Sequence, residues 1–283
     1  MNTVWSEQIQ GIQTLYLSRK LRFDDLFFEQ YQSVFEIEKD TKIKILEIGC
    51  GPGALAESLH RWYPNAEIVA VDRDINFLEY GSRHVAGVRF VEGDAAHLPF
   101  ADGSFDVTIS NTVQEHVEPD AFWGEQRRML TSGGICLCLS ARRGLCCTAP
   151  CLAQTEAEER FWNGINSEDE REKYGVGRYA VSEAELAAGM ERHGFENVTT
   201  GYAVIDLTPD DLKYSAPMAE RMIEAQRQTN LEAIASAHSD QDAEAVAAVN
   251  AKYDERLRLY RAGIKQWDTS VSVTMILRGE KHV

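Results

Sequence analysis

The sequence predicts an α/β protein with a doubly wound, mostly parallel sheet. From Ile43 onward, short β-branched runs alternate with stretches of helical periodicity, which is the rhythm of βαβ units. A glycine-rich turn follows the first of these runs, and Asp72 ends the second. Because crossovers between parallel strands are right-handed, successive units bring the carboxyl ends of their strands to one edge of the sheet, where ligands bind.

The first elements follow from the spacing of apolar residues. Residues 3–38 carry apolar side chains at helical intervals, so a helical segment precedes the core. The β-branched runs predict strands at 43–48, 67–71, 88–92, 105–110 and 134–140. The stretches between them predict helices at 53–62, 74–85 and 119–130.

The second half of the chain departs from this rhythm and then returns to it. A charged segment runs from Glu156 to Lys173. Ser182 and Glu185 then form a capping box, which predicts a helix over 182–193 that stops at Gly194. Strands are predicted at 197–206 and 267–278, with two helices between them that separate near 238–241. The second of these helices has one apolar stripe: Val246, Val249, Tyr253, Leu257, Tyr260 and Ile264.

The composition narrows the function class. Asp and Glu total 45 against 29 Lys and Arg, and the net charge of -16 repels a phosphate backbone, so no nucleic-acid partner is predicted. No apolar run approaches the roughly 20 residues of a membrane span, and no signal peptide is evident, which predicts a cytoplasmic protein. The six cysteines do not resemble a secreted disulfide framework. Structural thiols are favoured over a soft-metal site for Cys146, Cys147 and Cys151.

The glycine-rich turn after the first strand is the clearest sign of a ligand site. Its glycines let the backbone turn sharply and approach a ligand closely. Gly49, Gly51 and Ala54 also satisfy the G-x-G-x-x-A form of the dinucleotide fingerprint, so a nicotinamide or flavin enzyme is an alternative.

Acidic residues beside the turn distinguish the two interpretations. The charge of Glu47 opposes a pyrophosphate but suits a ligand that has no phosphate and carries a cationic sulfonium and amine. Asp72 can accept hydrogen bonds from ribose hydroxyls in either case. Asp94, followed by Leu98-Pro99-Phe100, offers a carboxylate for an adenine amino group and an apolar wall for its ring. These features favour the ligand without a phosphate.

Five successive motifs resemble those of the class I S-adenosylmethionine-dependent methyltransferases, in particular the ubiquinone and menaquinone biosynthesis branch. They are ILEIGCGPG at 45–53, VDRD at 71–74, GDAAHLPF at 93–100, FDVTISN at 105–111 and LTSGGICLCLS at 130–140. The resemblance implies a seven-stranded sheet in the order 3-2-1-4-5-7-6 with an antiparallel last strand. It also implies S-adenosylmethionine as cofactor, with a small-molecule acceptor.

The resemblance further implies which residues contact the cofactor. Glu47, Gly49 and Gly51 would line its methionine part. Asp72 would bind the ribose hydroxyls. Arg73, Asp94 and the backbone of Ala95 would contact the adenine, and Asn111 would lie near the transferable methyl group.

Methyl transfer itself sets few further requirements. Displacement at a sulfonium needs acceptor, methyl and sulfur in line, so positioning and exclusion of water supply most of the acceleration. A base is needed only for a hydroxyl, an acidic carbon or a protonated amine. His116 is the candidate base, with a structural or solvent-facing role as the alternative. A related branch links a Glu-x-x-Glu-His pattern to a metal, but Thr112 replaces its first Glu here, and no metal is predicted.

The chain is therefore divided into a core with additions. The parts are an N-terminal helical segment (1–40), a Rossmann-like methyltransferase core (41–206 and 266–283), an insertion after the fifth strand (141–181) and a helical insertion (207–265). Both insertions follow strands whose carboxyl ends face the site, so the helical one is a lid or a homodimer surface. Two roles are considered for the basic residues Arg19, Lys20 and Arg22: they bind the carboxylate of the cofactor, or they are solvated charges on the surface of a helix. Two alternatives remain: a nicotinamide-dependent oxidoreductase and a non-catalytic S-adenosylmethionine-binding protein.

Overall fold

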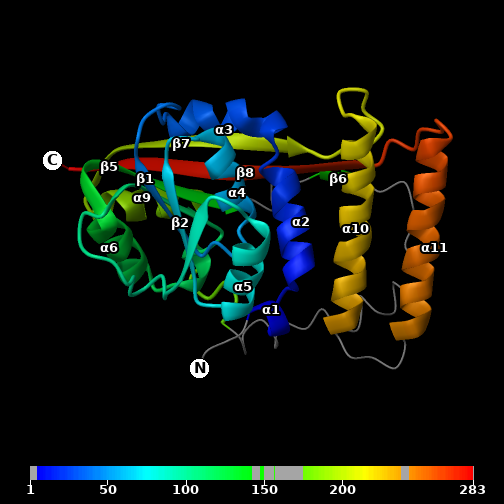
Figure 1. Cartoon of the computed structure of the whole chain (residues 1–283), viewed down its shortest axis with the longest axis horizontal. Helices are drawn as coiled ribbons and strands as arrows, with labels where there is room; N and C mark the ends of the chain where they lie inside the picture. The colour runs from blue at the N-terminus through cyan, green and yellow to red at the C-terminus, as the bar shows by residue number, and fades with distance from the viewer. Residues whose placement is uncertain (1–4, 142–146, 150–155, 157–174, 237–241, 283) are drawn as a thin grey trace.

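The computed structural model describes residues 5–141, 147–149, 156, 175–236 and 242–282, in which helices cover both faces of an eight-stranded sheet (Figure 1). The strands are β1 (Lys44–Ile48), β2 (Glu67–Asp72), β3 (Val88–Glu92), β4 (Phe105–Asn111), β5 (Leu130–Ala141), β6 (Cys147–Ala149), β7 (Phe195–Asp206) and β8 (Thr269–Lys281). The helices are α1 (Trp5–Gln8), α2 (Ile12–Arg22), η1 (Asp25–Phe27), α3 (Phe28–Phe35), α4 (Ala54–Trp62), α5 (Ile75–His84), η2 (Gln114–His116), α6 (Pro119–Met129), α9 (Glu183–Arg192), α10 (Ala216–Ser236) and α11 (Asp242–Arg261).

The strands are arranged in the order β3-β2-β1-β4-β5-β8, and β7 pairs with the other side of β8. β1 to β5 run parallel, whereas β8 is antiparallel to both of its long neighbours. With β7 and β8 as the sixth and seventh core strands, this is the predicted order, so the predicted fold class is confirmed. β6 is an additional strand that the sequence did not predict, and it pairs with residues 269–271 of β8, beyond the part paired with β5.

The central strands are apolar on both faces, as parallel strands between two helical layers require. β1 is buried from Ile45 to Ile48. Ile45 belongs to a core shared with α3, α4 and α5, whereas Phe122 of α6 and Met190 of α9 pack on the opposite face. The helices cover the two faces of the sheet, so the loops at the carboxyl ends of β1, β2 and β4 remain available to form a ligand site.

Two groups of helices lie outside these layers. α2 contacts α4, α5 and α10, and in Figure 1 it stands between the core and α10. α10 and α11 pack side by side through Ile223, Ile234, Val249, Tyr253 and Leu257. Met218 and Met222 of α10 instead pack with Leu21 of α2. The predicted stripe of α11 includes one error, because the helix ends at Arg261 and Ile264 lies beyond it, 48% exposed.

A buried arginine anchors α11 to the loops on either side of the helical pair. Arg256 is 1% exposed, and its Nη2 donates to Asp210 Oδ2 at 2.8 Å and to Asp268 Oδ1 at 2.5 Å. Asp210 Oδ2 also accepts from the backbone N–H groups of Gln266 and Trp267 at 3.0 and 2.8 Å. The charges are thus both paired and hydrogen-bonded, as burial of ions requires.

The edge strand β7 is covered by α3 through a side-chain amide. Gln30 Nε2 donates to Val204 O at 3.1 Å, and Gln30 Oε1 accepts from Val204 N at 2.8 Å. The amide therefore makes the two hydrogen bonds that a neighbouring strand would make at this residue.

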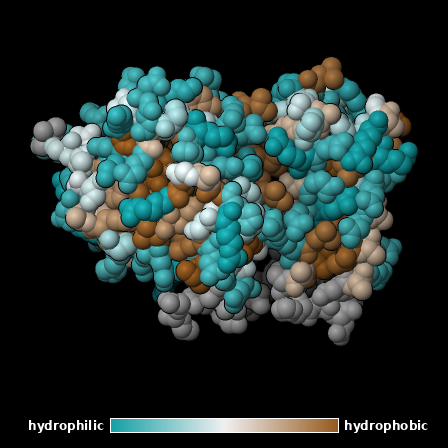
Figure 2. Space-filling view, viewed as in Figure 1, coloured by the Kyte–Doolittle hydropathy of each residue, from teal (hydrophilic) through white to brown (hydrophobic). Residues whose placement is uncertain are grey.

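The face seen in Figure 2 is mostly hydrophilic, and hydrophobic side chains gather over the lower part of the α10–α11 pair. In the described part of the chain, every helix is too short or too polar to span a bilayer.

Candidate functional site

A cavity of about 1200 Å³ opens at the carboxyl ends of β1, β2 and β4. α2 and α10 form part of its wall, so it lies between the core and the added helices. The structure brings together around it nine residues that the sequence predicted for the site: Glu47, Gly49, Gly51, Asp72, Arg73, Asp94, Ala95, Asn111 and His116. The predicted apolar wall of Leu98, Pro99 and Phe100 is not part of the lining, because Leu98 and Phe100 pack into a core cluster instead.

The turn between β1 and α4 depends on left-handed glycines. The φ angles of Gly49, Gly51 and Gly53 are 67°, 54° and 90°. A Cβ on Gly49 would collide with the Val113 side chain, and one on Gly51 would lie 3.1 Å from Leu15 Cδ2. The backbone conformation disfavours larger residues at all three positions, and the Val113 side chain also leaves no room for one at Gly49.

Glu47 presents a buried carboxylate to the cavity. It is 2% exposed, and its Oε2 has no hydrogen-bond partner among the described residues. Burial raises the pKa of Glu47 well above its ordinary value, the nearby Asp72 raises it further, and a hydrogen bond from the Ala56 backbone lowers it. A cation placed beside Glu47 would reverse this shift, so the group is suited to bind one.

Asp72 braces the glycine turn from the end of β2. Its Oδ2 accepts from Gly51 N at 2.8 Å, and its Oδ1 accepts from Asp74 N at 2.9 Å. Burial raises its pKa, and these two bonds oppose that rise. Each oxygen retains a lone pair, so both can still accept from ligand hydroxyls.

The loop after β3 is fixed by α6. Asp94 Oδ1 accepts from Ala96 N at 2.9 Å, which shapes the turn. Leu98 N donates to Glu125 Oε2 at 2.6 Å, and Arg128 Nη2 donates to Leu98 O at 2.9 Å. The hydrogen bonds from Arg128 hold the pKa of Glu125 below its ordinary value. The pair therefore keeps Asp94 and its neighbours at the rim of the cavity.

His116 lies in η2, beyond the end of β4. Its Nδ1 accepts from Gly177 N at 2.9 Å, and its Nε2 lies 3.9 Å from Glu115 Oε1. The Trp5 ring meets the imidazole edge-on, with 4.7 Å between centroids. Burial lowers the pKa of His116, which favours the neutral ring. Because Nδ1 is an acceptor, the proton of the neutral ring is on Nε2.

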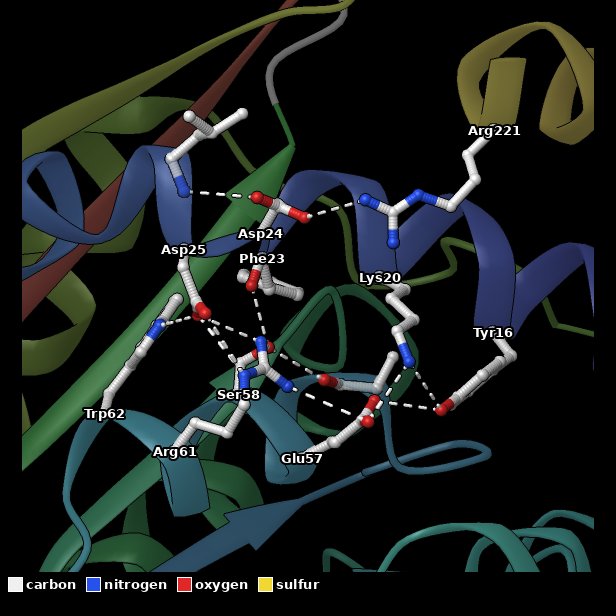
Figure 3. A network of polar contacts seen from close by, with 12 residues as sticks. Tyr16, Lys20, Phe23, Asp24, Asp25, Glu57, Ser58, Arg61, Trp62 and Arg221 are labelled. Carbon is white, nitrogen blue, oxygen red and sulfur yellow. Dashed lines mark hydrogen bonds and ion pairs between the residues drawn. The ribbon is translucent and has the colours of Figure 1, made fainter. Parts of the chain in front are cut away.

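α2 contributes two arginines to the site, which the sequence analysis had grouped with Lys20 without distinguishing them. Arg19 and Arg22 line the cavity, whereas Lys20 points away and pairs with Glu57 at 3.1 Å. Figure 3 shows this attachment of α2 to α4, in which the Tyr16 hydroxyl also donates to Glu57, at 2.9 Å. The Arg19 Nη2 donates to Thr112 Oγ1 at 3.0 Å, so its head lies at the end of β4.

α10 completes the wall and caps α2. Thr229 and Glu232 line the cavity, and both oxygens of Glu232 lie 3.0 Å from Thr14 N. The N-cap of α2 is Gly11, which has no side chain to accept this bond. Glu232 therefore acts as the cap of α2. This cap could not be predicted from the sequence, because Glu232 and Thr14 are 218 positions apart.

The structure adds little to the cysteine and metal predictions. Cys146 and Cys151 lie outside the described residues, as does the side chain of Cys147. Cys50, Cys136 and Cys138 are free and buried. The residues that the structure describes contain no group of three or more His, Cys, Asp or Glu side chains able to hold a metal ion.

Comparison with protein families supports the interpretation of the motifs. Residues 46–138 match the family described as a methyltransferase domain. The fatty-acid O-methyltransferase of Mycolicibacterium smegmatis is 28% identical over 173 residues, covering 50% of this chain and 62% of that protein. The demethylmenaquinone methyltransferase of Roseiflexus castenholzii is 36% identical over 103 residues, 35% of this chain and 43% of that protein. The chain therefore spans less than two thirds of either relative.

Solved structures share the fold at low identity. Phosphoethanolamine N-methyltransferase 2 of Haemonchus contortus, in complex with S-adenosyl-L-methionine, aligns with 100% of this chain and 60% of its own, with a TM-score of 0.56 and 17% identity. The [4+2]-cyclase SpnF aligns with 93% of this chain and 82% of its own, with a TM-score of 0.51 and 19% identity. The fold thus occurs in proteins named for different reactions.

Proposed function

Because residues 46–138 form a methyltransferase domain of the Rossmann-like class I type, we propose that this chain transfers a methyl group from S-adenosylmethionine to a small-molecule acceptor. The observation that carries the proposal is the buried carboxylate of Glu47, whose Oε2 has no partner among the described residues and faces the cavity. A ligand that fits must supply a donor or a cation there. The ammonium group of S-adenosylmethionine meets that need, whereas the pyrophosphate of NAD would be repelled.

The other residues around the cavity fit the remaining parts of this cofactor. Asp72 has free lone pairs for the two ribose hydroxyls. Asp94 and the backbone of Ala95 would bind the adenine edge, with Arg73 beside the ring. The bare backbone at Gly49 and Gly51 admits the methionine part, and Asn111 would lie near the sulfur. These assignments are proposals that rest on the cavity lining and on the motif positions.

When bound, S-adenosylmethionine supplies an electrophilic methyl group on a positively charged sulfur. The chain's own contribution is to orient and enclose the reactants. Glu47 and Asp72 would hold the cofactor at the ends of β1 and β2, while α2 and α10 add walls that limit the access of water. Ligand cavities commonly measure about 300–1,000 Å³. The volume of about 1200 Å³ therefore leaves space for an acceptor beside the cofactor.

We also propose that the helical insertion is a lid. Thr229 and Glu232 of α10 line the cavity, which supports the lid more than the homodimer surface. The absence of nucleic-acid partners remains part of the proposal, on the strength of the acidic composition. Location in the cytoplasm is proposed as well.

Ligand-induced stabilisation tests the function. S-adenosylmethionine and S-adenosylhomocysteine should raise the melting temperature, and NAD should not. Formation of S-adenosylhomocysteine in the presence of metabolite fractions should then identify a methyl acceptor. Stabilisation by NAD alone would refute the proposal in favour of an oxidoreductase.

A second function is binding of S-adenosylmethionine without methyl transfer. It is favoured by the engagement of His116 Nδ1 with Gly177, which leaves that imidazole without a free lone pair for a proton. Binding without any S-adenosylhomocysteine formation across the fractions would support it.

A further inference from the structure

Hydrogen-bond donors gather where α2 meets the end of β4. The Arg19 guanidinium lines the cavity and donates to Thr112 Oγ1, and no carboxylate of the described residues forms an ion pair with it. Burial lowers the pKa of Arg19, and Arg22, one turn further along α2, lowers it as well. An arginine nevertheless stays charged at neutral pH. Among the residues that the structure describes, the wall therefore holds a cation with no carboxylate in ion-pair contact.

His116 adds a second donor on the same loop. Its Nδ1 accepts from Gly177 N at 2.9 Å, so the neutral ring carries its proton on Nε2. Glu115 Oε1 lies 3.9 Å from that nitrogen, which is too far for a hydrogen bond. Glu115 also acts electrostatically on Arg19. Both donors thus line the cavity and interact electrostatically with Glu115, and neither is hydrogen-bonded to its carboxylate.

We propose that the acceptor is a carboxylate, held between the guanidinium of Arg19 and the Nε2–H of His116, and that it is methylated on oxygen. This inference rests on the proposed function. The apolar side chains of Val176, Val181 and Val273 also line the cavity, which suits an acceptor with a hydrocarbon body.

The chemistry of such an acceptor agrees with the donors. A carboxylate oxygen uses a lone pair to form the new O–CH₃ bond, the bond between the methyl carbon and sulfur breaks, and its electron pair stays on sulfur. The negative charge of the acceptor and the positive charge of the sulfonium cancel, and no proton moves. A general base is therefore unnecessary. His116 then serves as a donor that positions the acceptor.

Binding to the protein loaded with S-adenosylhomocysteine gives the test, with octanoate as probe and uncharged octanamide as its matched control. Octanoate should bind by calorimetry, octanamide should not, and octanoate with S-adenosylmethionine should give methyl octanoate. Arg19→Gln should weaken octanoate binding about 10- to 100-fold while S-adenosylhomocysteine affinity changes by less than about threefold. Lys20→Gln removes the same charge from α2 outside the cavity and should leave octanoate binding unchanged.

Further variants separate a donor from a base. His116→Gln retains a donor near the Nε2 position and should keep most octanoate binding, whereas His116→Leu should lose it. Glu115→Gln removes a competing carboxylate and should tighten binding.

Equal binding of octanoate and octanamide, or loss of methyl ester formation in Glu115→Gln with binding intact, would overturn the proposal. So would a tenfold or larger loss of S-adenosylhomocysteine affinity in Arg19→Gln, about 1.4 kcal/mol, because Arg19 would then hold the cofactor's carboxylate. Failure of the unaltered protein to bind S-adenosylhomocysteine would instead refute the proposed function.

Discussion

Replacing Glu47 with glutamine should stabilise the ligand-free protein and weaken the cofactor complex. Glutamine keeps the shape of the side chain and removes its charge. A buried group without a hydrogen-bond partner costs about 1–3 kcal/mol, more when it is charged. Glu47 is 2% exposed and its Oε2 is unpartnered among the described residues. The glutamine amide has no partner among the described residues there either, so Glu47→Gln removes only the additional cost of the charge. We therefore expect it to raise the free energy of unfolding by about 1–2 kcal/mol near pH 8.

The sign of the pH dependence follows from the direction of the pKa shift. Burial raises the pKa of Glu47 above its ordinary 4.5, so the folded protein retains a proton that the unfolded chain has already released. The contribution of this group to stability is fully present below pH 4.5 and is lost as the pH rises through the raised pKa. The difference between Glu47→Gln and the unaltered protein should accordingly shrink toward acid pH.

The effect on binding has the opposite sign. Truncating one partner of a buried charge pair costs about 2–5 kcal/mol, which corresponds to about 30-fold weaker binding or more. Urea unfolding at two pH values measures the stability, and calorimetric titration with S-adenosylhomocysteine measures the binding. If the variant binds within about threefold of the unaltered protein, or is less stable near pH 8, the role assigned to Glu47 is wrong.

Other predictions concern the turn and the added helices. Gly51→Ala should cost about 1–2 kcal/mol of stability, because alanine is strained at a φ of 54°, and should reduce cofactor affinity in the same titration. Glu232→Gln should cost about 1 kcal/mol and speed proteolysis within α2, since it weakens the cap on Thr14 N. Arg256→Met should cost about 3–5 kcal/mol in urea unfolding by leaving buried carboxylates unpaired, and unchanged stability would refute the anchoring role.

Much of the core could be predicted because its signals are local. β-branched runs and the capping box at Ser182 gave strands and helices whose bounds differ from the structure by a few residues. The largest difference is at β5, predicted at 134–140 and observed at Leu130–Ala141. A register shift lets Leu130 pair with Phe105 ahead of the regular ladder, and pairing between distant residues leaves no periodic trace.

The wall of the cavity was less predictable. Helical spacing alone places Leu15, Arg19 and Arg22 on one face and Lys20 on another, so that distinction was available in the sequence. The cap from Glu232 was not, because it depends on how α10 docks against α2. The tautomer of His116 likewise depends on Gly177, a residue 61 positions away.

The amide of Gln30 occupies part of the open edge of the sheet. β7 ends the sheet on one side, and Tyr202 and Val204 on its outer face are 46% and 45% exposed. An exposed apolar edge strand is a template on which another chain can add a strand. By occupying both backbone groups of Val204, Gln30 removes one rung from that template. The short helix α3 thereby shortens the stretch of β7 that remains open to another strand.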